Sequence, residues 1–184
     1  MRVLAGINQK RLFKSMLANS RGRLYRMAFS WTHDPALADD LVQQTCYQAL
    51  RKQKHLRDIE AADAWLFRIL ANCLADHHRA RRELYCGDLP QAVEKWTPEH
   101  ATQEDQVARR VREAVGTLPL VQRQVVTLVD LEGFSYAAVA SILDIPVGTV
   151  MSRLSRGRRA LRDRLIDTHP GAEMDVPNKV RRIK

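Results

Sequence analysis

Six arginines lie within one short segment near the end of the chain, together with a single acid. The arginines of residues 153–164 are Arg153, Arg156, Arg158, Arg159, Arg162 and Arg164, and the acid is Asp163. The planar guanidinium fork of arginine binds phosphate groups and the edges of guanine bases. A helix that needs only solubility usually mixes both signs of charge, although a solvated arginine-rich face is the simpler alternative. The segment therefore indicates a nucleic-acid-binding surface.

Two predicted helices joined by a tight turn position these arginines. Apolar residues recur at helical spacing from Val139 to Leu143, the pattern breaks at residues 144–146, and it resumes along a second helix. We expect that helix to bury the stripe formed by Val147, Val150, Leu154, Leu161 and Leu165. The opposite face and its edges carry the candidate DNA contacts Thr149, Ser152, Arg153, Ser155, Arg156 and Arg159. Such a pair of helices is typical of a DNA-binding helix-turn-helix.

The composition agrees with a polyanionic partner. The chain has 30 Lys and Arg against 21 Asp and Glu, which gives a net charge of +9 and an isoelectric point near 9.9. A membrane surface is the competing polyanion, but no apolar run approaches the roughly 20 residues of a spanning helix. The start of the chain also lacks the long apolar segment of a signal peptide. We therefore expect a soluble, cytoplasmic protein that binds no membrane.

The three cysteines argue against a disulfide framework or a cysteine-rich metal site. Cys46, Cys73 and Cys86 are odd in number and form no C-x-x-C pair. We expect reduced thiols, and neither a cofactor nor a bound metal.

Helical periodicity extends over two long stretches with a gap between them. It covers residues 9–83 and 104–167, and no strand-like alternation is visible in either. Residues 84–103 contain glycine and proline with apolar residues at no fixed period, which is typical of a linker. Residues 168–184 form a basic tail that begins at a proline and glycine stop. The sequence predicts an all-α protein of two small helical domains joined by a flexible linker.

The first domain contains a well-marked helix with a polar stripe. Asp34 is the predicted N-cap, Pro35 occupies the first helical position, and the helix extends to about Leu50 with Leu41 in the core. The exposed side carries Asp39, Asp40, Gln43, Gln44 and Tyr47. Taken alone, such a stripe is more often a solvated face than a docking surface.

A longer helix is predicted over residues 64–82. Its aromatic start, Trp65 to Phe67, should lie in the core, whereas Arg68, Asn72 and Arg79 fall along one exposed line that leads to Arg82. The basic end of the helix meets its negative pole, so these arginines are equally explained as phosphate contacts or as compensation of the helix dipole.

In this order, these segments resemble the sigma factors of bacterial RNA polymerase, specifically the extracytoplasmic-function (ECF) group of the sigma-70 family. Residues 24–28 and 34–45 are similar to the conserved block that binds the polymerase clamp. Residues 64–69, Asn72 and residues 76–77 are similar to the helix that recognises the −10 promoter element. Residues 118–119, 122–123, 132–136 and 145–154 are similar to the domain that reads the −35 element.

The resemblance implies a sigma factor, not an enzyme, whose partners are core RNA polymerase, through the clamp of its largest subunit, and promoter DNA. An anti-sigma protein is a further partner that it allows. It implies that the stripe from Asp39 to Tyr47 binds the polymerase and that Arg68, Asn72, Arg79 and Arg82 bind the melted −10 strand. The turn between Arg57 and Asp63 would share in capturing the melted bases. Family positions that usually carry a charge are occupied here by Gln44, Ala137, Ala138 and Met151.

Two other functions are compatible with parts of the pattern. A stand-alone operator-binding regulator would share the helix-turn-helix, but it would normally need a dimer, and no heptad repeat is visible. An enzyme could use Cys73 with Asp76, His77 and His78, because a cysteine and a histidine four residues apart share a helix face. Two ligands fall short of a metal site, and the sequence places no third.

Overall fold

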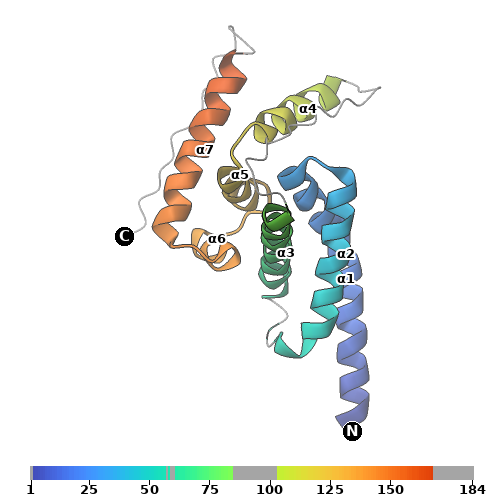
Figure 1. Cartoon of the computed structure of the whole chain (residues 1–184). Coiled ribbons are helices and arrows are strands. Elements are labelled where there is room, and N and C mark those ends of the chain that lie inside the picture. The colour runs from blue at the N-terminus through green and yellow to red at the C-terminus, as the bar shows by residue number, and fades with distance from the viewer. Residues whose placement is uncertain (1, 57, 59–60, 85–102, 168–184) are drawn as a thin grey trace.

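The computed structural model describes residues 2–56, 58, 61–84 and 103–167, and every element in these ranges is helical (Figure 1). The predicted linker and basic tail lie outside the described residues, apart from residues 84 and 103. The elements are α1 (Arg2–Thr32), α2 (Pro35–Lys52), the 3-10 turn η1 (Gln53–His55), α3 (Ala62–Leu84), α4 (Gln103–Gly116), α5 (Leu120–Val126), the π-helical segment η2 (Thr127–Leu131), α6 (Tyr136–Leu143) and α7 (Val147–Asp167).

Helices α1 and α2 form an antiparallel hairpin, and the predicted cap defines its turn (Figure 1). The side chain of Asp34 accepts a hydrogen bond from the backbone N–H of Leu37 at 3.0 Å, and Pro35 is the first residue of α2. Because proline has no N–H to leave unpaired at this position, it starts the helix without cost. The predicted start of this helix is confirmed, and its end lies at Lys52, close to the predicted Leu50.

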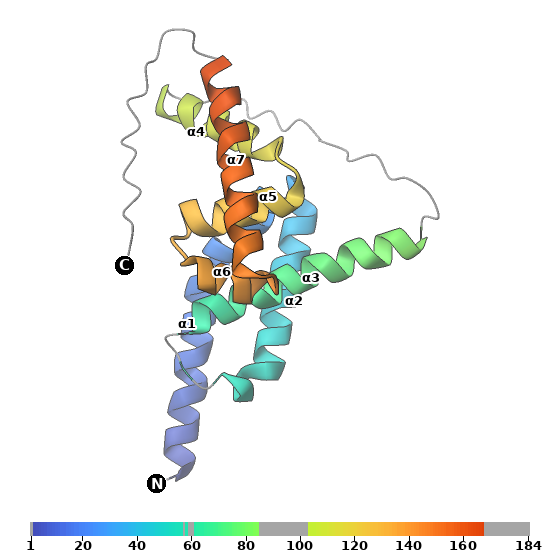
Figure 2. The ribbon, with the colours of Figure 1, turned by 90° about the vertical axis from the view of Figure 1, so that its left-hand side faces the viewer.

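One apolar core joins the first three helices to those after residue 103. Leu41, Phe67 and Leu70 from the first part belong to the same buried cluster as Leu128 and Val150 from the second. Helix α6 lies against α3 in both views of the ribbon (Figures 1 and 2). The burial of Leu41 and of the aromatic start of α3 at Phe67 agrees with the sequence prediction.

The predicted helix-turn-helix is present as α6, a turn at residues 144–146 and α7. Ser135 caps α6 by accepting from the N–H of Ala138 at 3.2 Å, and Asp144 ends it in the left-handed conformation at φ 54°. The chain bends by 103° between the two helices, within the range usual for this motif. The burial prediction was wrong for Val147, which is 43% exposed, because α6 has already ended at Leu143 and does not cover the first turn of α7.

The end of α1 is enclosed by residues from the second part. His33 adopts φ 54° just after the helix, and its ring packs so closely on Gly116 that an added Cβ there would lie 2.8 Å from Nε2. This buried Nε2 has no hydrogen-bond partner. Burial lowers the pKa of His33, and the positive charge of Arg123 lowers that pKa further. The imidazole is therefore held neutral in the folded chain.

We predict that His33 makes folding stability sensitive to acid. The unfolded chain takes up a proton on this residue below about pH 6.5, whereas the folded chain resists protonation until a lower pH, so this contribution to the free energy of unfolding is lost as the pH falls. The variant His33→Asn keeps a residue that tolerates the left-handed conformation. Urea unfolding followed by circular dichroism between pH 7 and pH 5 should show a shallower pH dependence for the variant. The same pH dependence of the free energy of unfolding in both proteins would contradict the assignment of this effect to His33.

Candidate nucleic-acid and protein-binding surfaces

Close packing against α5 and η2 sets the position of α7. Gly157 has no side chain where α7 crosses α5, and a Cβ added there would lie 2.6 Å from Cγ2 of Val126. Directly before the DNA-contact candidate Arg159, Arg158 donates from Nε and Nη2 to the two carboxylate oxygens of Asp130 at 3.1 and 2.5 Å. This hydrogen bond raises the pKa of Arg158. Arg158 thus holds α7 against η2. The sequence analysis had counted it only among the six arginines of a nucleic-acid-binding surface.

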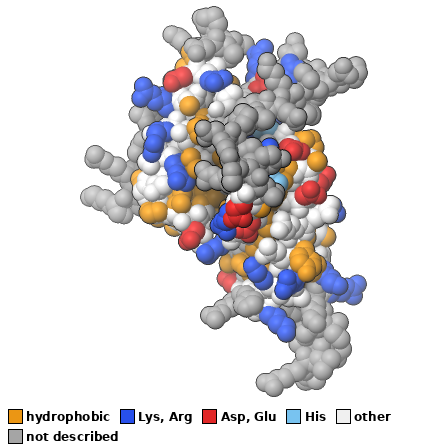
Figure 3. All heavy atoms as spheres, viewed as in Figure 1, with side chains coloured by type: hydrophobic (Ala, Val, Ile, Leu, Met, Phe, Trp, Pro, Cys, Tyr) orange, Lys and Arg blue, Asp and Glu red, His pale blue; other side chains and the backbone are white. Residues whose placement is uncertain are grey.

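The candidate DNA contacts of α7 gather on its outer face. Ser155, Arg156 and Arg159 are exposed, whereas Thr149, Ser152 and Arg153 are half-buried at the edge. Lys and Arg side chains are spread along the side of the molecule that α7 forms, on the left in Figure 3. Arg156 donates to the backbone oxygen and to Oγ of Ser152 at 3.2 and 3.3 Å, so its guanidinium lies along the helix.

Two apolar side chains extend this face, and the sequence analysis had not proposed them as contacts. Val147 and Met151 are 43% and 54% exposed, and they precede Ser155 at steps of four residues. Apolar side chains in a major groove can contact the methyl group of thymine. The unusual residue at position 151 was the one sequence signal for this feature.

The candidate residues of α3 that the structure describes are all exposed. Arg68, Asn72 and Arg79 lie at steps of four and seven on this helix, opposite the buried Phe67, Leu70 and Leu74. Arg79 forms an ion pair with Asp76 at 3.3 Å, and both side chains are so exposed that the pair adds little stability. The side chain of Arg82 lies outside the described residues, as do Arg57 and residues 59–60 of the predicted capture turn.

The polar stripe of α2 faces solvent along its whole length. Its candidate residues Asp39, Asp40, Gln43, Gln44 and Tyr47 are all exposed. The opposite side of the helix is fixed by buried Ala38, Leu41, Val42, Thr45 and Ala49. Tyr47 is 60% exposed, and the guanidinium of Arg51 stands 5.6 Å from the centre of its ring. The C-terminal end of the stripe therefore carries a flat tyrosine ring with a cation over its face.

Within the described residues, no three His, Cys, Asp or Glu side chains are grouped so that they could hold a metal ion. Burial raises the pKa of both Cys46 and Cys73. Over the same part of the chain, no single helix is long and apolar enough to cross a membrane, although the bent pair α6–α7 passes that test by length and composition only.

Comparison with known protein families matches both halves of the chain. The model described as Sigma-70 region 2 matches residues 16–83, and the model described as Sigma-70, region 4 matches residues 108–161. The chain is 32% identical over 148 residues to the ECF RNA polymerase sigma factor SigE of Mycolicibacterium smegmatis. This alignment covers 78% of the present chain and 57% of SigE. The chain is also 30% identical over 166 residues to the RNA polymerase sigma-H factor of Pseudomonas aeruginosa. That alignment covers 83% of the present chain and 85% of the sigma-H factor.

Two solved structures share the fold. The sigma factor RpoE from Bartonella quintana, solved in complex with the anti-sigma factor NepR, aligns with a TM-score of 0.70 and 30% identity, over 83% of this chain and 96% of that one. CnrH, solved in complex with the cytosolic domain of CnrY, aligns with a TM-score of 0.61 and 27% identity, over 91% and 97%.

The contact of Gly157 with Val126 yields a prediction about stability. Gly157→Ala should lower the free energy of unfolding by about 1–3 kcal/mol, because the new methyl group overpacks against a side chain that is 3% exposed. Gly148→Ala is the matched control, since nothing lies within 4 Å of a Cβ at that position of the same helix. Urea denaturation should show the control to be neutral or slightly stabilised.

The double variant Gly157→Ala with Val126→Ala tests the cause. Removing the valine methyl groups makes room for the new Cβ, so the two substitutions together should cost less than the sum of their separate effects. If the two stability losses simply add, steric contact between these positions does not cause the destabilisation by Gly157→Ala.

Proposed function

Because the chain belongs to the ECF group of the sigma-70 family of RNA polymerase sigma factors, we propose that α2 docks on core polymerase, α3 captures the melted −10 strand and α7 reads the −35 element. As a sigma factor, the chain directs promoter-specific transcription initiation. The observation that carries the proposal is the order of the two matches, region 2 on the first helices and region 4 on the helix-turn-helix. We propose these helices as two domains, 9–83 and 104–167, connected by the linker.

The stripe on α2 supplies the proposed polymerase contacts. Asp39 and Asp40 provide negative charge, Gln43 and Gln44 provide hydrogen bonds, and Tyr47 offers a large amphipathic ring. Exposed aromatic side chains of this kind are enriched in protein interfaces. Because the opposite side of α2 is buried in the core, the stripe already faces solvent before a partner binds.

Helix α3 supplies the proposed contacts to melted DNA. Opening a duplex costs several kcal/mol of stacking and pairing, which capture of the displaced bases can offset. Asn72 can hydrogen-bond a base edge in two places, while Arg68 and Arg79 can hold the sugar-phosphate backbone. All three are exposed on a helix whose other side is locked into the core.

Helix α7 supplies the proposed duplex contacts. Arg156 can bond two acceptors of a guanine, and Arg159 and Ser155 lie on the same exposed face. The half-buried Thr149, Ser152 and Arg153 would contact phosphates at the edge of the groove. Val147 and Met151 would add apolar contacts with thymine methyl groups.

We propose three partners, namely core RNA polymerase, promoter DNA and an anti-sigma protein. The last rests on the similarity to the Bartonella quintana factor, whose structure contains the anti-sigma factor NepR. We expect these interactions to take place in the cytoplasm, without a cofactor or enzymatic activity. The sigma-factor names of the relatives favour this function over a stand-alone operator-binding regulator.

Run-off transcription tests the proposal directly. The chain with core polymerase should initiate at a subset of templates from a promoter library, and neither component should do so alone. Tight, sequence-specific binding of the isolated chain to duplex DNA, without transcription when core polymerase is added, would favour the operator-binding regulator.

We predict unequal effects of two arginines on α7. Arg156→Ala should weaken promoter binding by the holoenzyme by about 1–3 kcal/mol and relax the preference at one base pair of the −35 element. Arg162→Ala removes the same charge roughly 9 Å further along the helix, and it should weaken all sequences alike or change little. Filter binding to a set of −35 variants at fixed salt measures both. Equal losses with unchanged sequence preference would mean that the arginines act only through net charge.

We predict that α2 variants separate docking from folding. Asp40→Lys with Gln43→Ala should impair association with core polymerase and leave the helical content unchanged, because both side chains are exposed. Leu41→Ala should instead lower the free energy of unfolding by roughly 2–5 kcal/mol, because it empties a site that is 1% exposed. Native gel assembly and circular dichroism distinguish the two effects. Normal assembly by the double variant would exclude the stripe as the docking surface.

A further inference from the structure

The first turns of α7 carry no charged side chain. From Val147 to Ser152 the residues are a valine, a glycine, a threonine, a second valine, a methionine and a serine, and the exposed Arg156 and Arg159 come later in the helix. In a helix-turn-helix, the N-terminal residues of the second helix contact base edges in the major groove. Two-point hydrogen bonds to bases come from Arg, Lys, Asn or Gln side chains, and this end of α7 has none of them. It therefore reads bases through other contacts.

The side chains that stand out from this end of α7 are apolar. Val147 and Met151 are 43% and 54% exposed, and we call these two residues the apolar pair. The serine hydroxyl beside them is engaged within the helix. Oγ of Ser152 donates to the backbone oxygen of Thr149 at 3.0 Å and accepts from Nη2 of Arg156 at 3.3 Å. The apolar pair is thus the most prominent feature that this end presents to a base edge.

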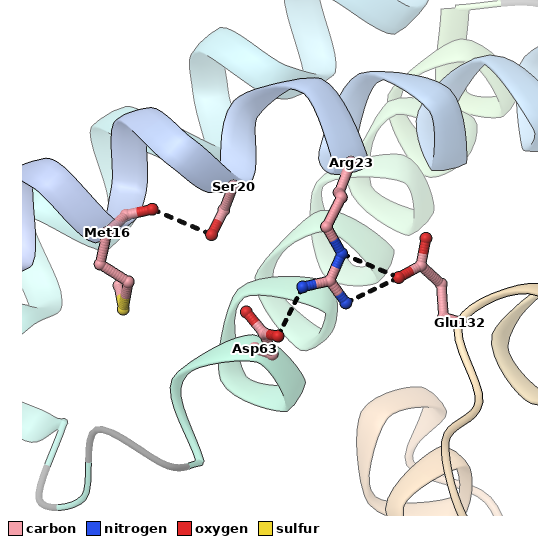
Figure 4. A network of polar contacts seen from close by, with 5 residues as sticks. All are labelled: Met16, Ser20, Arg23, Asp63 and Glu132. Carbon is pink, nitrogen blue, oxygen red and sulfur yellow. Dashed lines mark hydrogen bonds and ion pairs between the residues drawn. The ribbon is translucent and has the colours of Figure 1, made fainter.

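The packing of the fold does not account for the apolar pair. Among the described residues, neither member belongs to the buried core or to the side chains packed against it. Other contacts hold the segment that leads into α6. Glu132 accepts from Nε and Nη2 of Arg23 at 3.0 and 2.7 Å, beside the bond of Arg23 to Asp63 at 2.6 Å (Figure 4). The ring of Phe134 meets the ring of Phe67 on α3 edge to face, with 5.4 Å between centroids. The apolar pair is therefore available to a ligand.

The apolar pair begins an exposed row that points toward DNA. The row continues at steps of four residues through Ser155 to Arg159, so a cation for the phosphates follows on the same face. Nothing lies within 4 Å of a Cβ built at Gly148, which leaves the surface beside the pair open. Four residues rise about 6 Å along a helix, or roughly two base-pair steps of about 3.4 Å. The two members of the pair can therefore contact bases about two steps apart.

We infer that the apolar pair is a binding site for pyrimidines that carry a methyl group at C5, so that α7 distinguishes methylated from unmethylated bases in the −35 element. This inference rests on the proposed function. The C5 methyl group of thymine is the apolar group that a base pair presents in the major groove. 5-Methylcytosine carries the same group at the same ring position, so the site accepts both bases. Met151 has the flexible, polarizable side chain that adapts to such a contact.

Substitution of deoxyuridine for thymine tests the site, because it removes only the C5 methyl group and keeps the hydrogen-bonding edge. A −35 element that the wild-type holoenzyme selects from a random library is synthesised with one deoxyuridine at each thymine in turn, and equilibrium binding of the holoenzyme is measured. At one thymine or more, we expect about fourfold weaker binding, the effect of losing one buried methyl group. At a sensitive position, a 5-methylcytosine–guanine pair should bind more tightly than a cytosine–guanine pair by a similar factor.

Three variants assign the effect to the apolar pair. Met151→Ala shortens the side chain and should make binding equal for thymine and deoxyuridine at one sensitive position, and for methylated and unmethylated cytosine there. Met151→Leu keeps the apolar surface and should keep the fourfold difference. Ile166→Ala is the matched control, because Ile166 is a 48% exposed apolar residue of the same helix, roughly 22 Å further along it. This control should behave like the wild type.

A selected element without thymine, or one in which every deoxyuridine is neutral, would overturn the inference. So would methyl sensitivity that Met151→Ala leaves unchanged at every position. Weaker assembly of Met151→Ala with core polymerase in the absence of DNA would show that the apolar pair contacts protein instead. The proposed function fails separately, if the wild-type chain supports no run-off transcription from the thymine template. In that case the deoxyuridine comparison is made with the isolated chain on the duplexes that it selects.

Discussion

The π-helical segment η2 is the junction on which the arrangement of the chain depends. Thr127 begins it and accepts from Trp31 of α1, Asp130 within it binds Arg158 of α7, and Glu132 just after it binds Arg23. A π-helix closes its backbone hydrogen bonds over five residues where an α-helix uses four, so continuing α5 as a regular α-helix would point these side chains in other directions. The irregular segment and the residue after it thus contact both α1 and α7, through Thr127, Asp130 and Glu132.

Each polar contact at this junction is modest, and it adds to the buried apolar core that the two parts of the chain share. Partly exposed ion pairs contribute about 0.2–1 kcal/mol, an aromatic pair about 0.5–1.5 kcal/mol, and a hydrogen bond about 0.5–1.5 kcal/mol. Contacts of this size fix the orientation of η2 relative to α1 and α7, while the buried cluster of Leu41, Phe67 and Leu128 supplies apolar burial between the two parts.

Local signals made the helices and caps predictable, whereas contacts between distant segments were not. The Asp34–Pro35 start and the turn at residues 144–146 depend on neighbouring residues alone, and both were confirmed. Arg23 and Glu132 are 109 positions apart, and nothing near either residue indicates its partner. The exposure of Val147 and the pairing of Arg158 were missed for the same reason, since both depend on where another element ends or lies. The exposed faces of α2, α3 and α7 followed from helical phase, whereas the functions proposed for them stay predictions.

Shared contacts at η2 connect the end of α1 to the orientation of α7. The same short segment holds Arg158 of α7 on one side and contacts Trp31 on the other, so a shift of η2 that releases α1 also moves the anchor of α7. Gly157 limits how α7 can respond, because its closeness to Val126 prevents the helix from approaching α5 further. A displacement of η2 would therefore either carry α5 and α7 with it or break the Arg158–Asp130 pair. Joint movement is favoured, because Val125, Val126 and Leu128 are buried together with Val150 and Leu154, and separating η2 from α7 would expose part of this core.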